Sequence, residues 1–215
     1  MPNFRHSITL LLKISSFRAL CIGAGFAVFG AFGLVSWVID LFTRAHQLDL
    51  ENISTHLAFI YGIGGGVGML LGGYLADKFG QKNKATYLII PGTALLLSAP
   101  CLAAAIWSPE SYLAYLFLGA AVLLIHFYQA PIYALAQMLA PPQLRAQSAA
   151  CIIFVQIFFG IGVGPLAIGG LSDVLTPILG DGAGLRAAMS FLCISLMLAG
   201  LVFLRSAKKL VGDLR

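Results

Sequence analysis

Long apolar stretches, separated by short polar segments, dominate the chain. Six of them cover Ala19–Leu41, His56–Ala76, Ala85–Ile106, Tyr112–Tyr133, Ala149–Leu171 and Leu185–Leu204. At a helical rise of about 1.5 Å per residue, each can cross a hydrocarbon core of roughly 30 Å. The stretches are continuously apolar rather than alternating, which argues against a transmembrane β-barrel, and lipid-facing backbone must satisfy its own hydrogen bonds. The pattern therefore predicts an all-α membrane protein with six transmembrane helices.

Composition agrees with this pattern and divides the chain into three regions. Of the 215 residues, 60% are hydrophobic and only 10% are charged, whereas soluble domains have about 25% charged residues. We expect a cytoplasmic amphipathic lead-in at 1–18, a six-helix bundle at 19–205 and a cytoplasmic tail at 206–215. The apolar stretch Ile8–Leu12 is interrupted by Lys13, so an interfacial helix is favoured over a signal peptide.

Basic residues are distributed unequally between the segments that join the apolar stretches. One side of the predicted membrane protein has Arg5, Lys13, Arg18, Lys78, Lys82, Lys84, Arg145, Arg205, Lys208, Lys209 and Arg215. The other side has only Arg44 and Arg186, together with most of the acidic residues. By the positive-inside rule, we expect both termini in the cytoplasm and the plasma (inner) membrane as the location. This topology explains the net charge of +5, so a nucleic-acid-binding function is excluded.

Two glycine-rich segments share one order of residues. The first runs from Tyr61-Gly62-Ile63-Gly64 through Gly72-Gly73 to Asp77, and the second runs from Phe159-Gly160-Ile161-Gly162 through Gly169-Gly170 to Asp173. The first ends the second predicted helix and the other ends the fifth, so the two ends face opposite sides of the membrane. Chance similarity between glycine-rich helices is the alternative, but the shared order argues against it. The chain is therefore predicted to be a 3+3 inverted repeat, a plan typical of secondary transporters.

Glycine and proline positions predict how these two helices pack and where helices bend. Small residues spaced four apart lie on one helix face, namely Gly64, Gly68 and Gly72 in the second helix and Gly160 and Gly164 in the fifth. Such faces allow close helix packing, which taken alone favours a static role over a moving one. Pro131 and Pro165 each remove a backbone hydrogen bond within the membrane, so we expect bends in the fourth and fifth helices.

A candidate substrate-binding face lies on the fourth helix. Its members His126, Gln129, Tyr133 and Gln137 are spaced three or four residues apart, and polar groups in a membrane usually face the bundle interior or water. Gln156 on the fifth helix is a similar candidate. His126 could bind an anionic or hydroxylated solute, or titrate, since its reference pKa is about 6.5. The alternative is that these side chains only hydrogen-bond to neighbouring helices.

Several short motifs together resemble the major facilitator superfamily. The loop from Gly73 to Lys82 resembles that superfamily's signature Gly-x-Leu-Ala-Asp-Arg/Lys-x-Gly-Arg-Lys, and the run from Gly160 to Gly170 resembles its Gly-Pro-x-x-x-Gly helix motif. The spinster-like branch is closer still. It carries segments similar to Trp37…Arg44-Ala45-His46, Arg145-Ala146, Gly162…Asp173 and Leu185-Arg186, and these occur here in the same order.

The resemblance implies that the chain corresponds to helices seven to twelve, the C-terminal half of a twelve-helix transporter. Asp77, Lys78 and Arg145 share the predicted cytoplasmic side with the signature loop, so we expect them to form a cytoplasmic gate. The other expected gating residues are Gly80, Gly164, Pro165 and Asp173. The resemblance also implies that Phe29 and Trp37 on the first helix line the substrate cavity, although an aromatic stripe is more often core or lipid-facing. Asp40 and Gln81 depart from the family, which usually has Pro and Arg there, so the outer gate and the cytoplasmic clamp differ.

We therefore expect alternating-access transport of a small organic solute, weakly acidic or amphipathic, without a cofactor. The expected partners are the lipid bilayer and either an N-terminal six-helix half or a second copy of the chain, because six helices enclose half a pathway. A non-transporting partner subunit or a truncated remnant is the alternative. An intramembrane protease is disfavoured because no Gly-x-Ser-Gly motif occurs, and metal or haem ligation is disfavoured because His and Cys are scattered.

Overall fold

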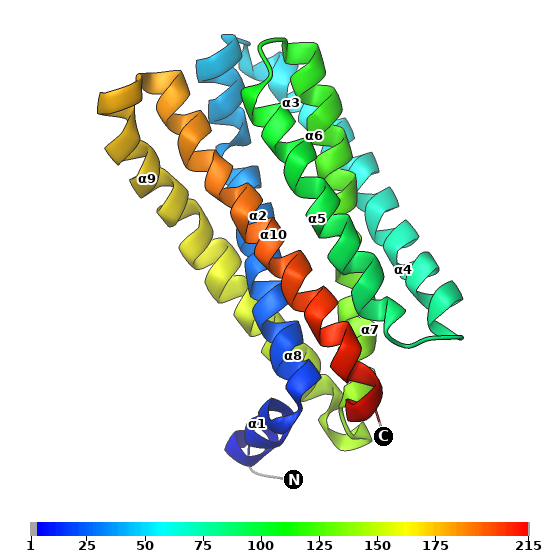
Figure 1. The fold of residues 1–215 in the computed structure, drawn as a ribbon. Helices are drawn as coiled ribbons and strands as arrows, with labels where there is room; N and C mark the ends of the chain where they lie inside the picture. The colour runs from blue at the N-terminus through cyan, green and yellow to red at the C-terminus, as the bar shows by residue number, and fades with distance from the viewer. Residues whose placement is uncertain (1–3, 215) are drawn as a thin grey trace.

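A bundle of helices makes up residues 4–214, the part of the chain that the computed structural model describes (Figure 1). Its stretches that are long and apolar enough to cross a membrane are Ser15–His46, Leu50–Gly80, Thr86–Trp107, Ser111–Leu139, Pro142–Leu179 and Asp181–Leu210. Each covers one predicted stretch to within a residue. The prediction of six transmembrane helices is therefore confirmed, and the protein is an integral membrane protein.

Three of the spans are continuous α-helices. They are α2 (Ser15–His46), α5 (Thr86–Trp107) and α10 (Asp181–Asp213). Pro91 and Pro100 lie within α5 without interrupting it. The core of the bundle forms where α2 packs along α10, which in turn packs along α5.

The other three spans are interrupted near their middle. The second consists of α3 (Leu50–Phe59), the π-helix η1 (Ile60–Gly65) and α4 (Gly66–Gly80). The fourth consists of α6 (Ser111–His126) and α7 (Gln129–Leu139). The fifth consists of the 3-10 turn η2 (Pro142–Leu144), α8 (Arg145–Gln156), the π-helix η3 (Ile157–Val163) and α9 (Gly164–Leu179). The fourth and fifth spans, where bends are predicted at Pro131 and Pro165, are interrupted close to these prolines, while the π-helix in the second span arises without a proline.

The two π-helices occupy matching places in the predicted repeat. Each contains the aromatic residue and the first Gly-x-Gly of its segment, Tyr61 in η1 and Phe159 in η3. Each is followed by an α-helix that holds the double glycine. The repeat is thus expressed in backbone conformation as well as in residue order.

Glycine faces bring these spans against their neighbours as predicted. A Cβ added at Gly68 would lie 2.2 Å from the carbonyl oxygen of Leu123, and one at Gly72 would lie 2.3 Å from that of Phe127. A Cβ at Gly160 would lie 2.9 Å from Val28. Since no real Cβ tolerates the two shortest distances, α4 can approach the fourth span only because these positions are glycine.

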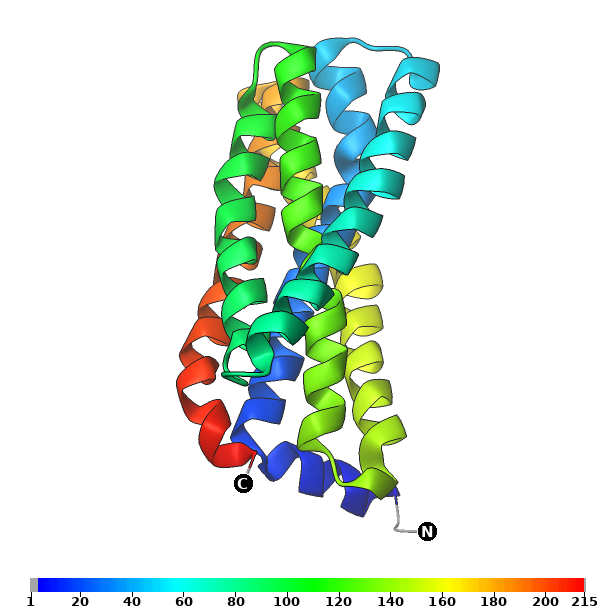
Figure 2. The ribbon, with the colours of Figure 1, turned by 90° about the vertical axis from the view of Figure 1, so that its right-hand side faces the viewer.

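Both ends of the described chain lie at the same end of the bundle, where α1 (Phe4–Lys13) crosses beneath the spans (Figure 2). Two expected boundaries shift: α2 begins at Ser15 rather than Ala19, and α10 continues through the expected tail to Asp213. The continuation has a physical reason, because Ala207 and Leu210 are buried. Residues 1–3 and 215 of the expected lead-in and tail lie outside the described residues.

Candidate functional site

The polar side chains predicted to bind a solute gather at the interruption of the fourth span. His126 is the last residue of α6 and Gln129 is the first of α7, separated by a turn at Phe127 and Tyr128. Pro131 explains the break, because it has no N–H to donate to the carbonyl of Phe127 four residues before it. The glycine face of α4 lies against that same carbonyl.

His126 and Gln129 line a cavity of about 260 Å³ between α2, η1 and the fourth span. The other lining residues are Val28, Ala31, Phe32, Leu34, Val35, Tyr61, Val122, Ile125 and Tyr128. Apolar walls with a few convergent polar groups are typical of small-molecule sites. The Nδ1 of His126 donates to the carbonyl of Val122 at 2.7 Å, so this ring nitrogen is satisfied within its own helix.

Tyr133 and Gln156 form the second part of the polar group. The Tyr133 hydroxyl donates to Oε1 of Gln156 at 2.5 Å, which joins α7 to α8. The hydroxyl of the fully buried Tyr128 lies within hydrogen-bonding reach of Gln156 and Gln129. Tyr128 thereby links the two parts. Gln137, the last member of the predicted face, is exposed.

Tyr61 is a cavity residue that sequence analysis missed. It lies in η1, lines the cavity, and its hydroxyl is buried without a hydrogen-bond partner among the described residues. Leaving a hydroxyl in that state costs about 1–3 kcal/mol. One feature of the sequence could have identified Tyr61: it is the first residue of the glycine-rich segment. That segment was interpreted only as a packing surface and as part of the repeat.

Phe29 and Trp37 lie apart from this polar group. Phe29 lines a separate, almost wholly apolar cavity of about 620 Å³ between α2, η3, α9 and α10. The Trp37 Nε1 donates to the carbonyl of Pro165 at 3.0 Å, and a Cβ at Gly169 would lie 2.7 Å from the indole ring. In this structure Trp37 therefore packs α2 against α9.

The residues predicted to form a gate fall into separate groups. The Tyr87 hydroxyl donates to Oδ1 of Asp77 at 2.6 Å, and Lys78 Nζ stands 5.6 Å from the centre of the Tyr74 ring. A Cβ at Gly80 would lie 2.3 Å from the Tyr87 ring. Asp77 thus meets α5, and no ion pair joins it to a basic residue within 4–214.

The remaining gate residues are distributed over α8 and α9. Arg145 is exposed at the start of α8, and Asp173 is exposed on α9. Gly164 and Pro165 form the junction between η3 and α9, and Gly164 packs against the backbone of Phe29. Apart from the adjacent pairs, the structure does not bring the predicted gate residues into contact.

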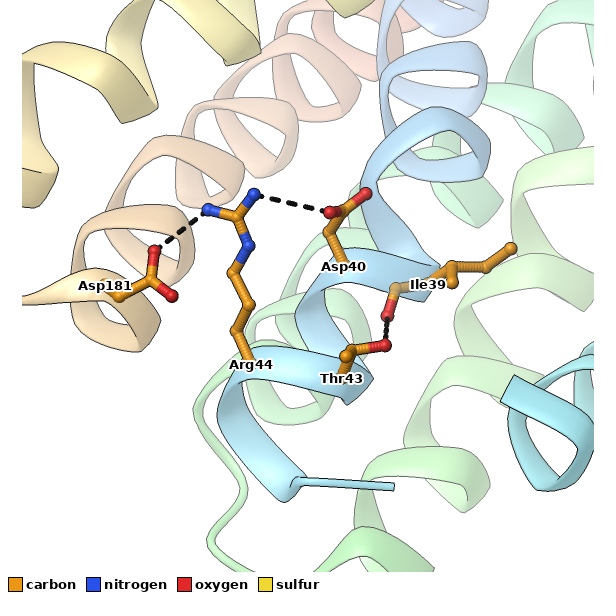
Figure 3. A network of polar contacts seen from close by, with 5 residues as sticks. All are labelled: Ile39, Asp40, Thr43, Arg44 and Asp181. Carbon is orange, nitrogen blue, oxygen red and sulfur yellow. Dashed lines mark hydrogen bonds and ion pairs between the residues drawn. The ribbon is translucent and has the colours of Figure 1, made fainter. Parts of the chain in front are cut away.

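An ion-pair network lies at the end of the bundle opposite the described termini (Figure 3). Arg44 contacts Asp40 at 3.3 Å within α2 and Asp181 at 3.0 Å at the start of α10. Asp40, which departs from the family pattern, thus shares a basic partner with α10. Because these side chains are largely exposed, the network contributes at most about 1 kcal/mol.

No group of three or more His, Cys, Asp or Glu side chains within 4–214 is placed to hold a metal ion. All four cysteines, Cys21, Cys101, Cys151 and Cys193, are free. The polar groups at the interruptions are uncharged side chains and one imidazole. Such groups can donate and accept hydrogen bonds.

Comparison with known proteins finds one matching family and one similar curated protein. The PUCC protein family matches residues 80–199. An "MFS-type efflux pump" of Mycolicibacterium smegmatis is 30% identical over 192 residues, which cover 89% of this chain and 44% of that protein. The chain therefore spans less than half the length of this curated relative.

Solved structures show the same fold. A bacterial homologue of the human lysosomal transporter Spinster, inward-facing and unoccupied, superposes with a TM-score of 0.89 at 20% identity, covering 98% of this chain and 51% of that one. Its occupied inward-facing form gives 0.81 at 20% identity, covering 92% and 50%. The predicted resemblance to a spinster-like major facilitator is confirmed at the level of the fold, and the six helices form half of it.

Proposed function

The chain belongs to the PUCC protein family and folds as one half of a major facilitator transporter, and on this premise we propose that it is the C-terminal half of a secondary transporter. It moves a small organic solute, amphipathic or weakly acidic, by alternating access. The main observation that supports this proposal is that polar side chains lie at or next to the interruption of each of the three interrupted spans. Tyr61 lies in η1, His126 and Gln129 flank the turn in the fourth span, and Gln156 immediately precedes η3.

Interrupted helices suit this role for a physical reason. Discontinuous spans supply binding groups near the membrane midplane of secondary transporters, and π-helical segments are frequent at functional sites. We propose His126, Gln129, Tyr133 and Gln156 as the polar contacts. Phe29 on the apolar cavity supplies surface for the solute's apolar part, and Trp37 acts through its packing on α9.

A second half is required to complete the pathway. The second and fifth spans are mostly uncovered: only 22% of the residues in the apolar part of each are buried within the bundle. The corresponding share in the first span is 61%. These two exposed spans are the surface that an N-terminal six-helix half, or a second copy of the chain, would cover. We place both termini in the cytoplasm and the chain in the plasma (inner) membrane, on the distribution of basic residues.

Vesicle transport tests this function. The chain is reconstituted alone and together with an N-terminal six-helix half, and counterflow of a labelled panel of membrane-impermeant organic acids and polyols is measured. We expect counterflow in the joined form and a fall of at least about ten-fold on His126→Ala plus Gln129→Ala, since truncating central binding residues costs about 2 kcal/mol or more. Tyr112→Phe, at an exposed position on α6, is the control. Equal counterflow in the double variant would contradict the assigned site.

The gate is tested separately at Asp77. Asp77→Asn keeps an oxygen that can accept from Tyr87 but removes the charge, so folding should be retained while exchange between inward and outward states changes several-fold. Distance measurements by double electron–electron resonance between spin labels on α4 and α8 give the populations. Unchanged populations and unchanged counterflow would remove Asp77 from the gate.

A further inference from the structure

The cavity beside η1 contains one hydrogen-bonding group that the protein leaves unused. The Tyr61 hydroxyl is buried and has no partner within 4–214, although the ring that carries it lines the cavity. Buried polar groups are nearly always paired with protein or water. An unpaired hydroxyl on a residue that lines a cavity would gain a hydrogen bond from a molecule that enters the cavity and reaches it.

His126 supplies a complementary group in the same cavity. Because Nδ1 donates to the Val122 carbonyl, the neutral ring presents Nε2 as an acceptor. This nitrogen lies beside η1, since a Cβ at Gly65 would lie 3.3 Å from Nε2. The cavity therefore offers a hydroxyl donor on η1 and an acceptor at the end of α6.

The charge of the cavity limits what it can receive. Of the described residues that line it, none is Lys, Arg, Asp or Glu. A carboxylate or an ammonium group would lose its hydration without gaining an opposite charge from this half. A hydroxyl or carboxamide could instead donate to His126 and accept from Tyr61, while its apolar part contacts Phe32 and Val35.

We infer that Tyr61 is a solute-binding residue and that this cavity receives an uncharged polar group, such as a hydroxyl or carboxamide, attached to a small apolar body. The inference rests on the proposed transport function and narrows its solute class from weakly acidic or amphipathic to neutral and amphipathic. A volume of about 260 Å³ is below the range of roughly 300–1,000 Å³ for drug-sized ligands. The cavity thus accommodates a small molecule or one end of a larger one.

Ligand-detected saturation-transfer NMR on the 215-residue chain in nanodiscs tests whether the cavity prefers an uncharged polar group. The signal from empty nanodiscs is subtracted to remove binding to lipid. The probes are hexane-1,2-diol, hexanoate and hexylammonium, which share one alkyl chain and differ in the polar group. We expect saturable binding of the diol, with both ions several-fold weaker. Tyr61→Phe should weaken diol binding about three- to ten-fold, the effect of one neutral hydrogen bond, and Tyr112→Phe should not.

Thermal unfolding separates binding from a structural role. Since the Tyr61 hydroxyl has no partner among the described residues, Tyr61→Phe should leave the unfolding midpoint unchanged or raise it. The inference would be overturned if Tyr61→Phe lowered the unfolding midpoint or left the affinity for the diol unchanged. It would also be overturned if the unmodified chain showed no saturable binding of the diol, or bound either ion as well as the diol. These measurements need no transport, so a failure of counterflow with intact diol binding would count against the proposed function alone.

Discussion

Gly80 shows how one residue without a side chain determines local structure at the end of the second span. Gly80 lies against the ring of Tyr87. The hydroxyl of Tyr87 donates a hydrogen bond to Asp77, which lies with Gly80 in the last turn of α4. The ring can pack this closely on the end of α4 because residue 80 has no side chain. The signature motif is therefore a packing unit as well as a candidate gate.

Gly80→Ala should destabilise the protein by about 1–3 kcal/mol, because its Cβ would stand 2.3 Å from the Tyr87 ring and buried overpacking has that cost. The unfolding midpoint in detergent or nanodiscs measures the effect. Gly170→Ala is the matched control, since nothing lies within 4 Å of a Cβ there. Equal stability of the two variants would show that the ring moves freely.

At the scale of elements, proline alone does not determine where a span is interrupted. Pro91 and Pro100 lie inside the unbroken α5, whereas the second span is interrupted at η1 without a proline. Where Pro165 follows η3, the Trp37 indole bonds its carbonyl and packs on Gly169. The junction between η3 and α9 is thus held from α2.

A double-mutant cycle tests this junction. Trp37→Phe should cost about 1 kcal/mol through the lost hydrogen bond to Pro165. Gly169→Ala should also destabilise the wild type, because a Cβ would lie 2.7 Å from the indole. Phe lacks the ring atoms at that point, so we expect Gly169→Ala to cost less in the Trp37→Phe background, with a coupling of about 0.5–3 kcal/mol. Additive effects on the unfolding midpoint would contradict direct packing.

At the scale of the whole molecule, the six spans differ in how much of their surface the bundle covers. The second and fifth spans, which the repeat relates to each other, are the least buried. Large apolar side chains such as Leu70 on α4 and Leu166 on α9 are 71% and 77% exposed. Lipid can cover such a surface, but a transport pathway requires protein there.

Cysteine cross-linking in membranes distinguishes protein from lipid on this surface. In a background without the four native cysteines, Leu70→Cys and Leu166→Cys should cross-link to a co-expressed N-terminal half, or to a second copy where no such half is present. Leu97→Cys on α5, 59% exposed, should not. Cross-linking of Leu97→Cys as readily as the other two would indicate random collision and contradict the proposed interface.

The sequence by itself determined the spans, the inverted repeat and the close packing of the glycine faces. Partition of apolar stretches into lipid and the size of a glycine are local properties, so they can be predicted without knowing the neighbours. Helical spacing also predicted one polar face on the fourth span, formed by His126, Gln129, Tyr133 and Gln137. The structure leaves Gln137 exposed and brings Gln156 of the fifth span to Tyr133.

Only the tertiary structure decided which groups actually meet. It paired Asp77 with Tyr87, directed Trp37 to Pro165 and separated Phe29 from the polar residues. It also left the Tyr61 hydroxyl without a partner within residues 4–214. These outcomes depend on the rotation and depth of each helix against its neighbours and on the register change that each interruption introduces. Such relations are set by packing between distant segments, which no local pattern of residues specifies.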